Sequence, residues 1–548
     1  MTKSRRKSRG RNKTPPHGNN PKPIPGSVAS EGVPGKDSPA KVSERSWQDR
    51  LFDPIDIASI AVFRICLGLL LLHDMHRFHA FGAIKTFYVD PPFLFAFFGL
   101  DFIRPLPAEG MYLLFGVLTI CTVLITVGLF YRVAITVFVL GFAYIFLLDE
   151  TRYLNHFYFA GLLCFLMVFV PASRGWSLDA LIAGRKQDAR VPAWSLWILL
   201  VQMEIMLIYA GIVKLDADWL RGEPLGFWLA AKADLPIIGP LLLNDAVVLI
   251  GAWGAAFLHL IGAVLLLFKS TRIYAFVVYC LFHLSNHVFF NIGIFPWLTI
   301  AATTLFFDPD WPKVVWRRIV ELLRLPASLQ TSLSSSTTGQ PWRIPPPAMR
   351  TAIVSMIVGW TALQVLLPLR HWLYPGNTGW HQQGYYFAWQ MMLRQKFVRG
   401  TFYVRDPDTN REWLVNPKDY LTPAQAVFML MRPEMIRQFA HYLEKEWARQ
   451  HGTRDIEVRA FTAVSLNGRR AQALIDPKRD LTKIGYSFAP ADWILPLKEP
   501  MPPKGQRWPG DEQEVLLRTM RADSTGARLL ADIERQKVSK RPGAKEKR

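Results

Sequence analysis

Nine apolar segments, most of them about 18 to 25 residues long, dominate the sequence up to residue 373. A helix of that length crosses the hydrocarbon core of a bilayer. Only 20% of the residues are charged, against roughly 25% in soluble domains. We therefore predict a polytopic α-helical membrane protein with about nine spans. The predicted spans are residues 55–76, 111–130, 132–149, 155–172, 194–214, 246–268, 272–289, 292–308 and 350–373.

The net charge of +21 could suggest a nucleic-acid partner, but the distribution of the charge favours a membrane. Basic residues gather in the N-terminal tail, in alternate loops such as those with Arg174, Lys269 and Arg317, and in the C-terminal tail. This is the positive-inside pattern with basic ends. We expect the N terminus in the cytoplasm, everything after the ninth span outside the cell membrane, and no nucleic-acid partner.

Composition divides the chain into four predicted parts. Residues 1–50 are polar and rich in Lys, Arg, Pro and Gly, which predicts a disordered cytoplasmic tail without a signal peptide. Residues 51–374 form the transmembrane domain, with 88–107 as an interfacial segment. For residues 375–500 we predict a mixed α/β extracytoplasmic domain. It has strands on either side of a turn at 406–410, a helix over 433–450 and a hairpin at Asn467-Gly468. Residues 501–548 predict a basic tail with one possible helix at 511–535.

Lys214 ends the fifth predicted span and is followed by Asp216, Asp218 and Trp219. Such a lysine can be an interfacial anchor whose ammonium reaches the headgroups. It can also act as a base, provided that burial in apolar surroundings holds the amine uncharged. Carboxylates beside the amine would oppose this, so we expect the two aspartates to hold the loop. Gly211 would let another group approach the backbone one turn earlier.

Further polar residues lie at the outer ends of other predicted spans. His156 begins the fourth span, and His283, Asn286 and His287 lie in the outer half of the seventh, where they share one helix face. Polar residues inside a membrane are costly, so a functional role is the first hypothesis for them. Hydrogen bonding to a substrate or cofactor, a structural role, and haem or metal binding through the two histidines of the seventh span all remain open.

The run from Tyr385 to Met392 is rich in aromatic and Met side chains. Trp389 and Met392 could line a pocket for a flat apolar cofactor, or the run could be an interfacial anchor. The sequence has no Gly-rich phosphate loop, no Gly-x-Ser-x-Gly and no Cys-x-x-Cys, and its four cysteines all lie in apolar segments. Mechanisms based on ATP, a serine hydrolase or a thiol therefore lack support, and we expect no metal site.

Several of these stretches resemble the vitamin K-dependent gamma-carboxylase family, in a bacterial form with the horizontally transferred transmembrane domain. The run AGIVKLDADW at 210–219 resembles the signature of that family. The segments at 282–307, 386–392 and 464–477 and the pair Asn155-His156 also resemble it, in the right order over about 50–500. Phe387 departs from the tyrosine of animal members, and no cysteine is placed for their disulfide.

The resemblance implies a chemistry and its partners. A lysine deprotonates reduced vitamin K, oxygen adds, and the resulting strong base removes a γ-proton from a peptide glutamate. CO2 then traps the carbanion, and the quinone leaves as its epoxide. Lys214 corresponds to that lysine, and His156 to a histidine linked to the later steps. The quinone would arrive from the lipid bilayer and the Glu-containing peptide from the aqueous side, with O2 and CO2 as co-substrates.

Two alternatives stay open at this point. The protein could be a quinol epoxidase or oxidase that carboxylates nothing, or a membrane transporter or scaffold without catalysis. Clear inverted repeats are absent from the sequence, which argues against a transporter. The tails and the expected lack of a signal peptide fit a bacterial inner membrane, where menaquinol could replace reduced vitamin K.

Overall fold

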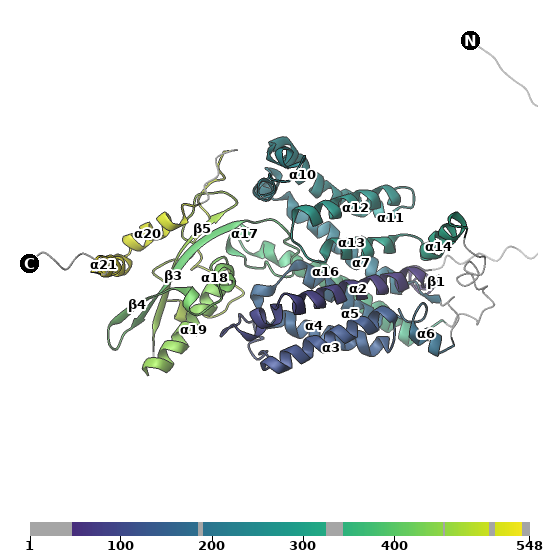
Figure 1. Ribbon diagram of the computed structural model, residues 1–548, viewed down its shortest axis with the longest axis horizontal. Helices are drawn as coiled ribbons and strands as arrows, with labels where there is room; N and C mark the ends of the chain where they lie inside the picture. The colour runs from purple at the N-terminus through teal and green to yellow at the C-terminus, as the bar shows by residue number, and fades with distance from the viewer. Residues whose placement is uncertain (1–45, 185–189, 325–343, 453–454, 504–509, 540–548) are drawn as a thin grey trace, which may run out of the picture. The chain divides into compact units, whose positions relative to one another are not determined.

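The computed structural model describes residues 46–184, 190–324, 344–452, 455–503 and 510–539 (Figure 1). The described residues from Trp47 onward form one compact unit. The predicted disordered tail falls outside the described residues except for 46–50, where α1 (Trp47–Arg50) forms a single helical turn.

All nine predicted spans contain helices. The long ones are α2 (Ala58–Ala80), α3 (Ala108–Val127), α4 (Tyr131–Leu148), α7 (Trp194–Ile212), α10 (Asp245–Phe257) with α11 (Ala263–Leu267), and α16 (Pro347–Leu369). Within the described residues, these give six helices or helical runs that are long and apolar enough to cross a membrane. The chain is therefore a polytopic helical membrane protein. The helices α5 (Asn155–Phe169), α12 (Arg272–Phe289) and α13 (Phe295–Thr303) fall outside that set, so the count of nine stays a prediction.

The tight connection expected between the second and third spans is a short turn from α3 to α4. Gly128 (φ 68°) and Phe130 (φ 45°) both adopt left-handed backbone conformations. The Asp179 carboxylate accepts hydrogen bonds from the backbone N–H groups of Phe130 and Tyr131, at 2.8 and 3.0 Å. This side chain satisfies N–H groups that a helix start leaves free, so a distant residue stabilises the turn.

Residues 88–107 do not cross the bundle, as predicted. After the π-helix η1 (Lys85–Val89) the chain has no regular structure until α3 begins at Ala108. Phe93 and Phe95 pack into the core of the C-terminal domain, and the Gln425 amide donates to the Phe93 carbonyl oxygen at 2.9 Å. This segment therefore joins the helical domain to the C-terminal domain.

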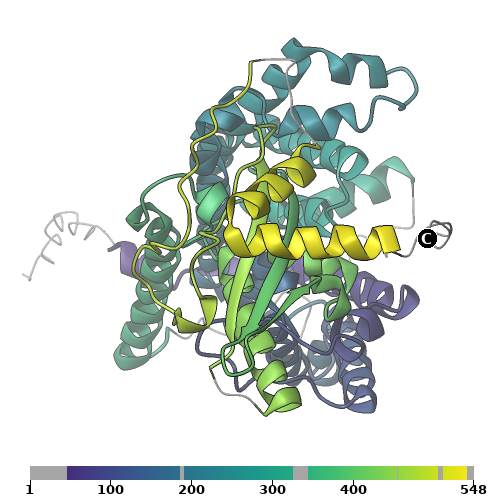
Figure 2. The ribbon, with the colours of Figure 1, turned by 90° about the vertical axis from the view of Figure 1, so that its left-hand side faces the viewer.

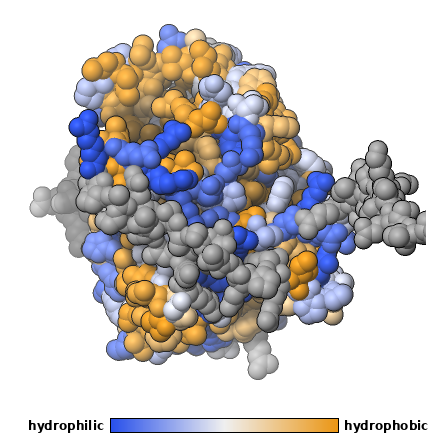
Figure 3. Space-filling view, turned by 90° about the vertical axis from the view of Figure 1, so that its right-hand side faces the viewer, coloured by the Kyte–Doolittle hydropathy of each residue, from blue (hydrophilic) through white to orange (hydrophobic). Residues whose placement is uncertain are grey.

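The opposite end of the helical domain contains elements that the sequence did not predict. The strands β1 (Pro54–Asp56) and β2 (Arg190–Pro192) pair antiparallel, and α14 (Trp311–Leu322) packs against α2. Lys313 of α14 forms an ion pair with Asp56 at 2.8 Å. Figure 3 shows this face of the molecule, with hydrophilic side chains across the middle and hydrophobic ones above and below.

The C-terminal domain is mixed α/β, as predicted. Strands β3 (Lys396–Asp406), β4 (Arg411–Val415) and β5 (Glu457–Leu466) form an antiparallel sheet in the order β4-β3-β5. Alternate side chains point to opposite faces of a strand. Phe402 and Val404 pack with α18 (Pro423–Leu430) and α19 (Pro433–His451), whereas Tyr403 packs with α20 (Glu512–Ala522). Figure 2 shows α20 and α21 (Ser524–Ser539) in front of the sheet.

Two local predictions for this domain were wrong. The turn at Asn467-Gly468 forms, with φ of 50° and 84°, but the chain after it makes only an isolated bridge between Gln472 and Val464. The predicted helix at 511–535 breaks at Asp523, whose carboxylate accepts from the N–H groups of Thr525 and Gly526, at 3.0 and 2.9 Å. A local cap of this kind starts a new helix.

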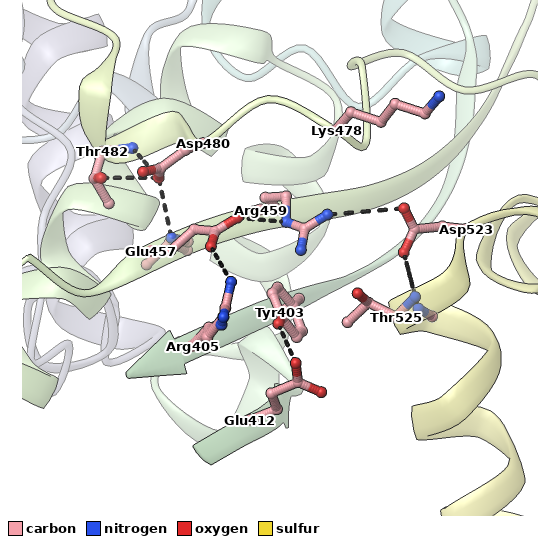
Figure 4. Close-up of polar contacts among 12 residues, drawn as sticks. Tyr403, Arg405, Glu412, Glu457, Arg459, Lys478, Asp480, Thr482, Asp523 and Thr525 are labelled. Carbon is pink, nitrogen blue, oxygen red and sulfur yellow. Dashed lines mark hydrogen bonds and ion pairs between the residues drawn. The ribbon is translucent and has the colours of Figure 1, made fainter. Parts of the chain in front are cut away.

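Polar contacts attach the second of these helices to the sheet (Figure 4). Arg459 of β5 lies 2.8 Å from Glu457 and 3.7 Å from Asp523 at the start of α21. On the neighbouring strand, the Tyr403 hydroxyl donates to Glu412 at 2.8 Å. The domain fold therefore continues beyond residue 500.

Candidate functional site at the end of α7

Lys214 lies at the end of α7, in the single turn η3 (Val213–Leu215). Its side chain is buried, with 5% of the residue exposed. The amine donates to the Ala210 carbonyl oxygen at 2.9 Å and lies 5.3 Å from the centre of the Trp219 ring. No carboxylate in the described part of the chain forms an ion pair with it. An amine enclosed in this way is not a snorkelling anchor.

The two aspartates after Lys214 hold the loop, as expected. The Asp216 carboxylate caps α8 (Ala217–Leu220) by accepting from the backbone N–H groups of Asp218 and Trp219, and burial raises the pKa of this carboxyl. Asp218 binds Arg469 through both of its oxygens, at 2.6 and 2.7 Å. It also accepts from the Asn467 amide at 2.9 Å. The turn at Asn467-Gly468 therefore fixes the loop that carries Lys214.

His259 is a site residue that the sequence did not single out. It lies in η5 (Leu258–Gly262), a π-helical turn between α10 and α11, and π-helical turns are frequent at functional sites. The ring is buried, its Nδ1 lies 2.6 Å from the Ala255 carbonyl oxygen, and it interacts electrostatically with Lys214 and His283. The sequence could have identified it, because a histidine inside the apolar segment 246–268 is itself a sign of function.

Gly211 explains how η5 comes so close to Lys214. A Cβ atom at this position would lie 2.7 Å from the Leu260 side chain and 3.0 Å from the Leu260 backbone nitrogen. Only a glycine leaves room for that approach without a shift of one helix. The predicted role of Gly211 in letting another group reach the backbone is therefore confirmed.

His283 and His287 differ in their surroundings although they lie on one helix face. His283 is 1% exposed and stacks with Tyr279 at 6.1 Å between ring centres. Neither of its ring nitrogens has a hydrogen-bond partner among the described residues. His287 is exposed and lies beside Trp297, at 5.2 Å, and Asn286 is half-buried. Only His283 reaches the interior, where a ligand could satisfy its nitrogens.

His156 begins α5 and lies against the loop that connects α12 to α13. Its ring is 4.6 Å from that of Phe157. A Cβ atom at Gly293 (φ 59°) would lie 3.5 Å from the His156 Nε2 and 3.2 Å from an Arg77 nitrogen. The two predicted catalytic residues, Lys214 and His156, therefore have different neighbours, and the histidine that interacts electrostatically with Lys214 is His259.

The segment from Gly384 to Met392 has an unusual backbone. Phe387, Trp389 and Met392 all have positive φ, at 57°, 54° and 57°. Such conformations cost about 1–3 kcal/mol each for residues with large side chains, and they cluster at ligand clamps and active sites. The segment is held by two hydrogen bonds from the start of α5: the Tyr153 hydroxyl accepts from the Phe387 N–H at 2.8 Å, and Asn155 donates to the Gln390 carbonyl oxygen at 3.1 Å.

The two predicted cofactor-binding residues of this segment pack into different hydrophobic clusters. Trp389 is fully buried against Tyr158 and Phe159, at 4.9 and 6.2 Å between ring centres, and its indole N–H has no partner among the described residues. Met392 packs into the cluster that contains Trp219. Phe295 lies 6.3 Å from Phe159 and 6.0 Å from His283. Trp389 and His283 are thus linked through Phe159 and Phe295.

An amine buried without a carboxylate partner can exchange a proton with a bound molecule. The Lys214 amine uses one hydrogen bond and keeps further capacity for a ligand. The unpartnered nitrogens of His283 and Trp389 are placed in surroundings that exclude water. Hydrogen-bond donors stabilise a developing charge more strongly in such surroundings than they would in water.

Two family models match the chain. Residues 52–311 match the HTTM domain, and residues 349–500 match the lumenal domain of vitamin K-dependent gamma-carboxylase. The first match contains Lys214, His156, His259 and His283, and the second contains the segment from Gly384 to Met392. No solved structure matches the chain.

Proposed function

From the premise that this chain belongs to the vitamin K-dependent gamma-carboxylase family, we propose that it is a quinol-dependent carboxylase of the membrane. It couples oxidation of reduced vitamin K or menaquinol to its epoxide with CO2 addition to a peptide glutamate. In the overall reaction, the quinol, O2, CO2 and a γ C–H group become the epoxide, water and a γ-carboxyglutamate. The observation that carries the proposal is the buried Lys214 amine, which has no carboxylate partner among the described residues.

Lys214 acts as the base in this proposal. Its nitrogen accepts a proton from a hydroxyl of the quinol, and the oxidised quinol supplies the strong base that removes the γ-proton of glutamate. Asp218 contributes indirectly, because Arg469 and Asn467 hold its carboxylate away from the amine. A carboxylate paired with Lys214 would keep the amine protonated.

The walls of the site bind and orient the quinol. Trp389 and Met392 give apolar contact, and His283 and the Trp389 indole offer hydrogen bonds to the quinone oxygens. Asn286 and His287 lie further out on α12, where they can contact the ligand as it enters from the lipid. His156 lies nearest the loop at Gly293, and we assign it to the later steps of the reaction, as the family resemblance implies.

We place the protein in the bacterial inner membrane with its N terminus in the cytoplasm. The C-terminal domain is then extracytoplasmic. The contacts of Asp218 with Arg469 and Asn467 attach the C-terminal domain to the end of the bundle that carries Lys214. A lipid-soluble quinone and an aqueous peptide can meet at that end.

The test is a reaction of the purified protein with a reduced quinone, bicarbonate and a Glu-containing peptide. We expect quinone epoxide by chromatography and carboxyl mass gains on the peptide. Lys214→Ala should lose both products, whereas Lys269→Ala, which removes an exposed lysine, should keep both. Full activity of Lys214→Ala would overturn the assignment. Epoxide without any carboxylated peptide would instead identify a quinol epoxidase.

A further inference from the structure

A cavity of about 490 Å³ lies apart from Lys214. It is enclosed by the segments 97–100, 381–387 and 484–494 and by the start of α19. None of the residues that contact Lys214 or His259 lines it. Its polar wall includes Glu150, Arg370, His381, Gln382, Tyr386 and Arg432.

The two guanidinium groups in this wall bind neutral groups. Arg432 donates to the backbone oxygen of Glu150 and to the Tyr386 hydroxyl, both at 2.9 Å, and Arg370 donates to the Tyr386 carbonyl oxygen. Burial raises the pKa of the Glu150 carboxyl to about 8. This shift favours the uncharged form of the side chain at neutral pH, which reduces its compensation of the Arg432 charge.

The other carboxylates of the wall are already paired. Glu434 binds Arg437 at 2.5 Å, and Asp492 binds Arg479 at 3.0 Å. A buried charge is stable only when a counter-charge or hydrogen bonds compensate for its lost hydration. The cavity is thus electrostatically prepared for an anion.

Two wall residues also have buried polar atoms without a hydrogen-bond partner among the described residues. These atoms are the Arg432 Nε and the Gln382 Oε1. The two residues are 6% and 9% exposed. Native proteins rarely leave such atoms unpaired, so they indicate a site that a polar ligand completes.

The rim of the cavity favours an anion carried on a peptide. Phe98 stacks on Tyr486 at 3.6 Å between ring centres, and Phe488 lies 4.9 Å from Phe98. Phe98 and Phe488 are 52% and 68% exposed. The chain over 485–490 is exposed and irregular, so it offers backbone hydrogen bonds to an extended peptide as well as apolar contact.

We propose that this cavity binds a side-chain carboxylate of the polypeptide substrate other than the one that reacts at Lys214. An apolar residue next to that carboxylate contacts Phe98, Tyr486 and Phe488. The proposal rests on the proposed function, because it names a second contact for the same substrate. Binding itself requires neither quinone nor catalysis, so it can be measured separately.

The experiment uses full-length protein in nanodiscs, without quinone, and fluorescently labelled peptides. Each peptide has one Glu and, at a varied spacing, a second position that is Asp or Asn. At one spacing or more, the Asp peptide should bind about tenfold more tightly than its Asn counterpart, as expected for a charge-assisted hydrogen bond. Equal affinities at every spacing would overturn the proposal.

Two variants locate the effect. Arg432→Gln removes the guanidinium and should abolish the Asp preference. Gly485→Trp narrows the cavity mouth. A Cβ at this position meets no atom within 4 Å, so the variant should abolish the Asp preference without disturbing the fold. Arg518→Gln, an exposed arginine of α20 paired with Glu514, is the matched control and should keep the preference. Retention of the preference in Gly485→Trp would overturn the location.

A pH series gives an independent check. Arg432 and Glu434 of α19, Tyr386 and the adjacent Asp149 all act on the Glu150 carboxyl. Ionised Glu150 competes with an anionic ligand, so the Asp preference should decline as pH rises through about 8. Glu150→Gln should show no such decline. A preference that is constant with pH in the wild type would contradict the role of this cavity.

The outcomes separate this proposal from the proposed function. An Asp preference without epoxide or carboxylated peptide would support the cavity and overturn the function. Turnover without any Asp preference would do the reverse. Lys214→Ala should lose turnover and keep the Asp preference.

Discussion

Two buried lysines of this protein lie over a tryptophan ring, one in each domain, and their surroundings differ. Lys214 is 5.3 Å from the centre of Trp219 and donates to one carbonyl oxygen. Lys396 is 5.6 Å from the centre of Trp380. Its amine donates to two carbonyl oxygens, those of Trp380 and Met431, at 2.6 and 2.8 Å.

The comparison shows that burial alone does not make a lysine a base. Burial, together with Arg394 and Arg432, lowers the pKa of Lys396 well below its usual value. Its two hydrogen bonds nevertheless join separate segments of the C-terminal domain, which is a structural role. Lys214 has one backbone acceptor and lies beside a second titratable side chain, His259. The two lysines differ in how many amine hydrogens remain free to donate to a ligand.

The largest expected effect separates the two lysines directly. Lys214→Met should reduce epoxide formation by about 10²–10⁴-fold, the range of a lost general base, with the thermal unfolding midpoint preserved. Lys396→Met should leave the Trp380 carbonyl oxygen without its donor, whereas the Met431 carbonyl oxygen keeps the Gln382 amide, and should cost roughly 1–3 kcal/mol of stability. Thermal unfolding and epoxide assays on both variants measure this. Loss of epoxide in a well-folded Lys396→Met would contradict the distinction.

The next effect concerns why Lys214 has no carboxylate partner. Arg469→Met removes the bidentate contact and leaves Asp218 buried without its cation, which should cost roughly 3–5 kcal/mol. The released carboxylate can then turn toward the Lys214 amine and keep it protonated, so epoxide formation should fall as well. Thermal unfolding measures the first effect and epoxide yield the second.

A double variant provides the control for this pair. Arg469→Met with Asp218→Leu removes both charges and should regain much of the lost stability, because no uncompensated charge remains. A pair that contributes nothing would instead give additive losses in the cycle.

Local patterns in the sequence were sufficient to predict much of the fold and to single out Lys214, the central residue of the site. The apolar segment that ends at Lys214 became α7, and the alternating pattern over 396–406 became β3. The strong turn residues Asn467-Gly468 formed their turn. Each of these features depends on residues close in sequence, so a single chain is enough to predict it.

The rest of the site depends on contacts between distant segments. Asp218 and Arg469 are 251 residues apart, and nothing in either neighbourhood identifies the other as its partner. His259 looked like one polar residue in an apolar run, because its position beside Lys214 depends on the close approach of Leu260 to Gly211. The hairpin prediction at 467 failed for a related reason, since Arg469 turns toward Asp218 directly after the turn.

A smaller effect tests that close approach. Gly211→Ala places a methyl group 2.7 Å from the Leu260 side chain, which should push α7 and η5 apart. Overpacking of this kind typically costs 1–3 kcal/mol of stability. Because the shift also moves the Lys214 amine, epoxide formation should fall as well. Gly254→Ala is the matched control, because a Cβ there meets no atom within 4 Å. Equal stability and equal epoxide yield of the two variants would show that the close approach of Leu260 to Gly211 does not contribute.

A further expected effect is a pH dependence of stability around Arg432. Arg432 interacts electrostatically with Lys396 and with Glu150, and burial raises the pKa of Glu150 from 4.5 to about 8. Between these two values the folded protein keeps a proton that the unfolded chain has lost, so stability should fall as pH rises and level off above about 8. Glu150→Gln should remove this fall and exceed the wild type in stability at alkaline pH. Unfolding midpoints of the two proteins that run parallel across this pH range would show that Glu150 ionises as freely as an exposed carboxyl, which would contradict its burial.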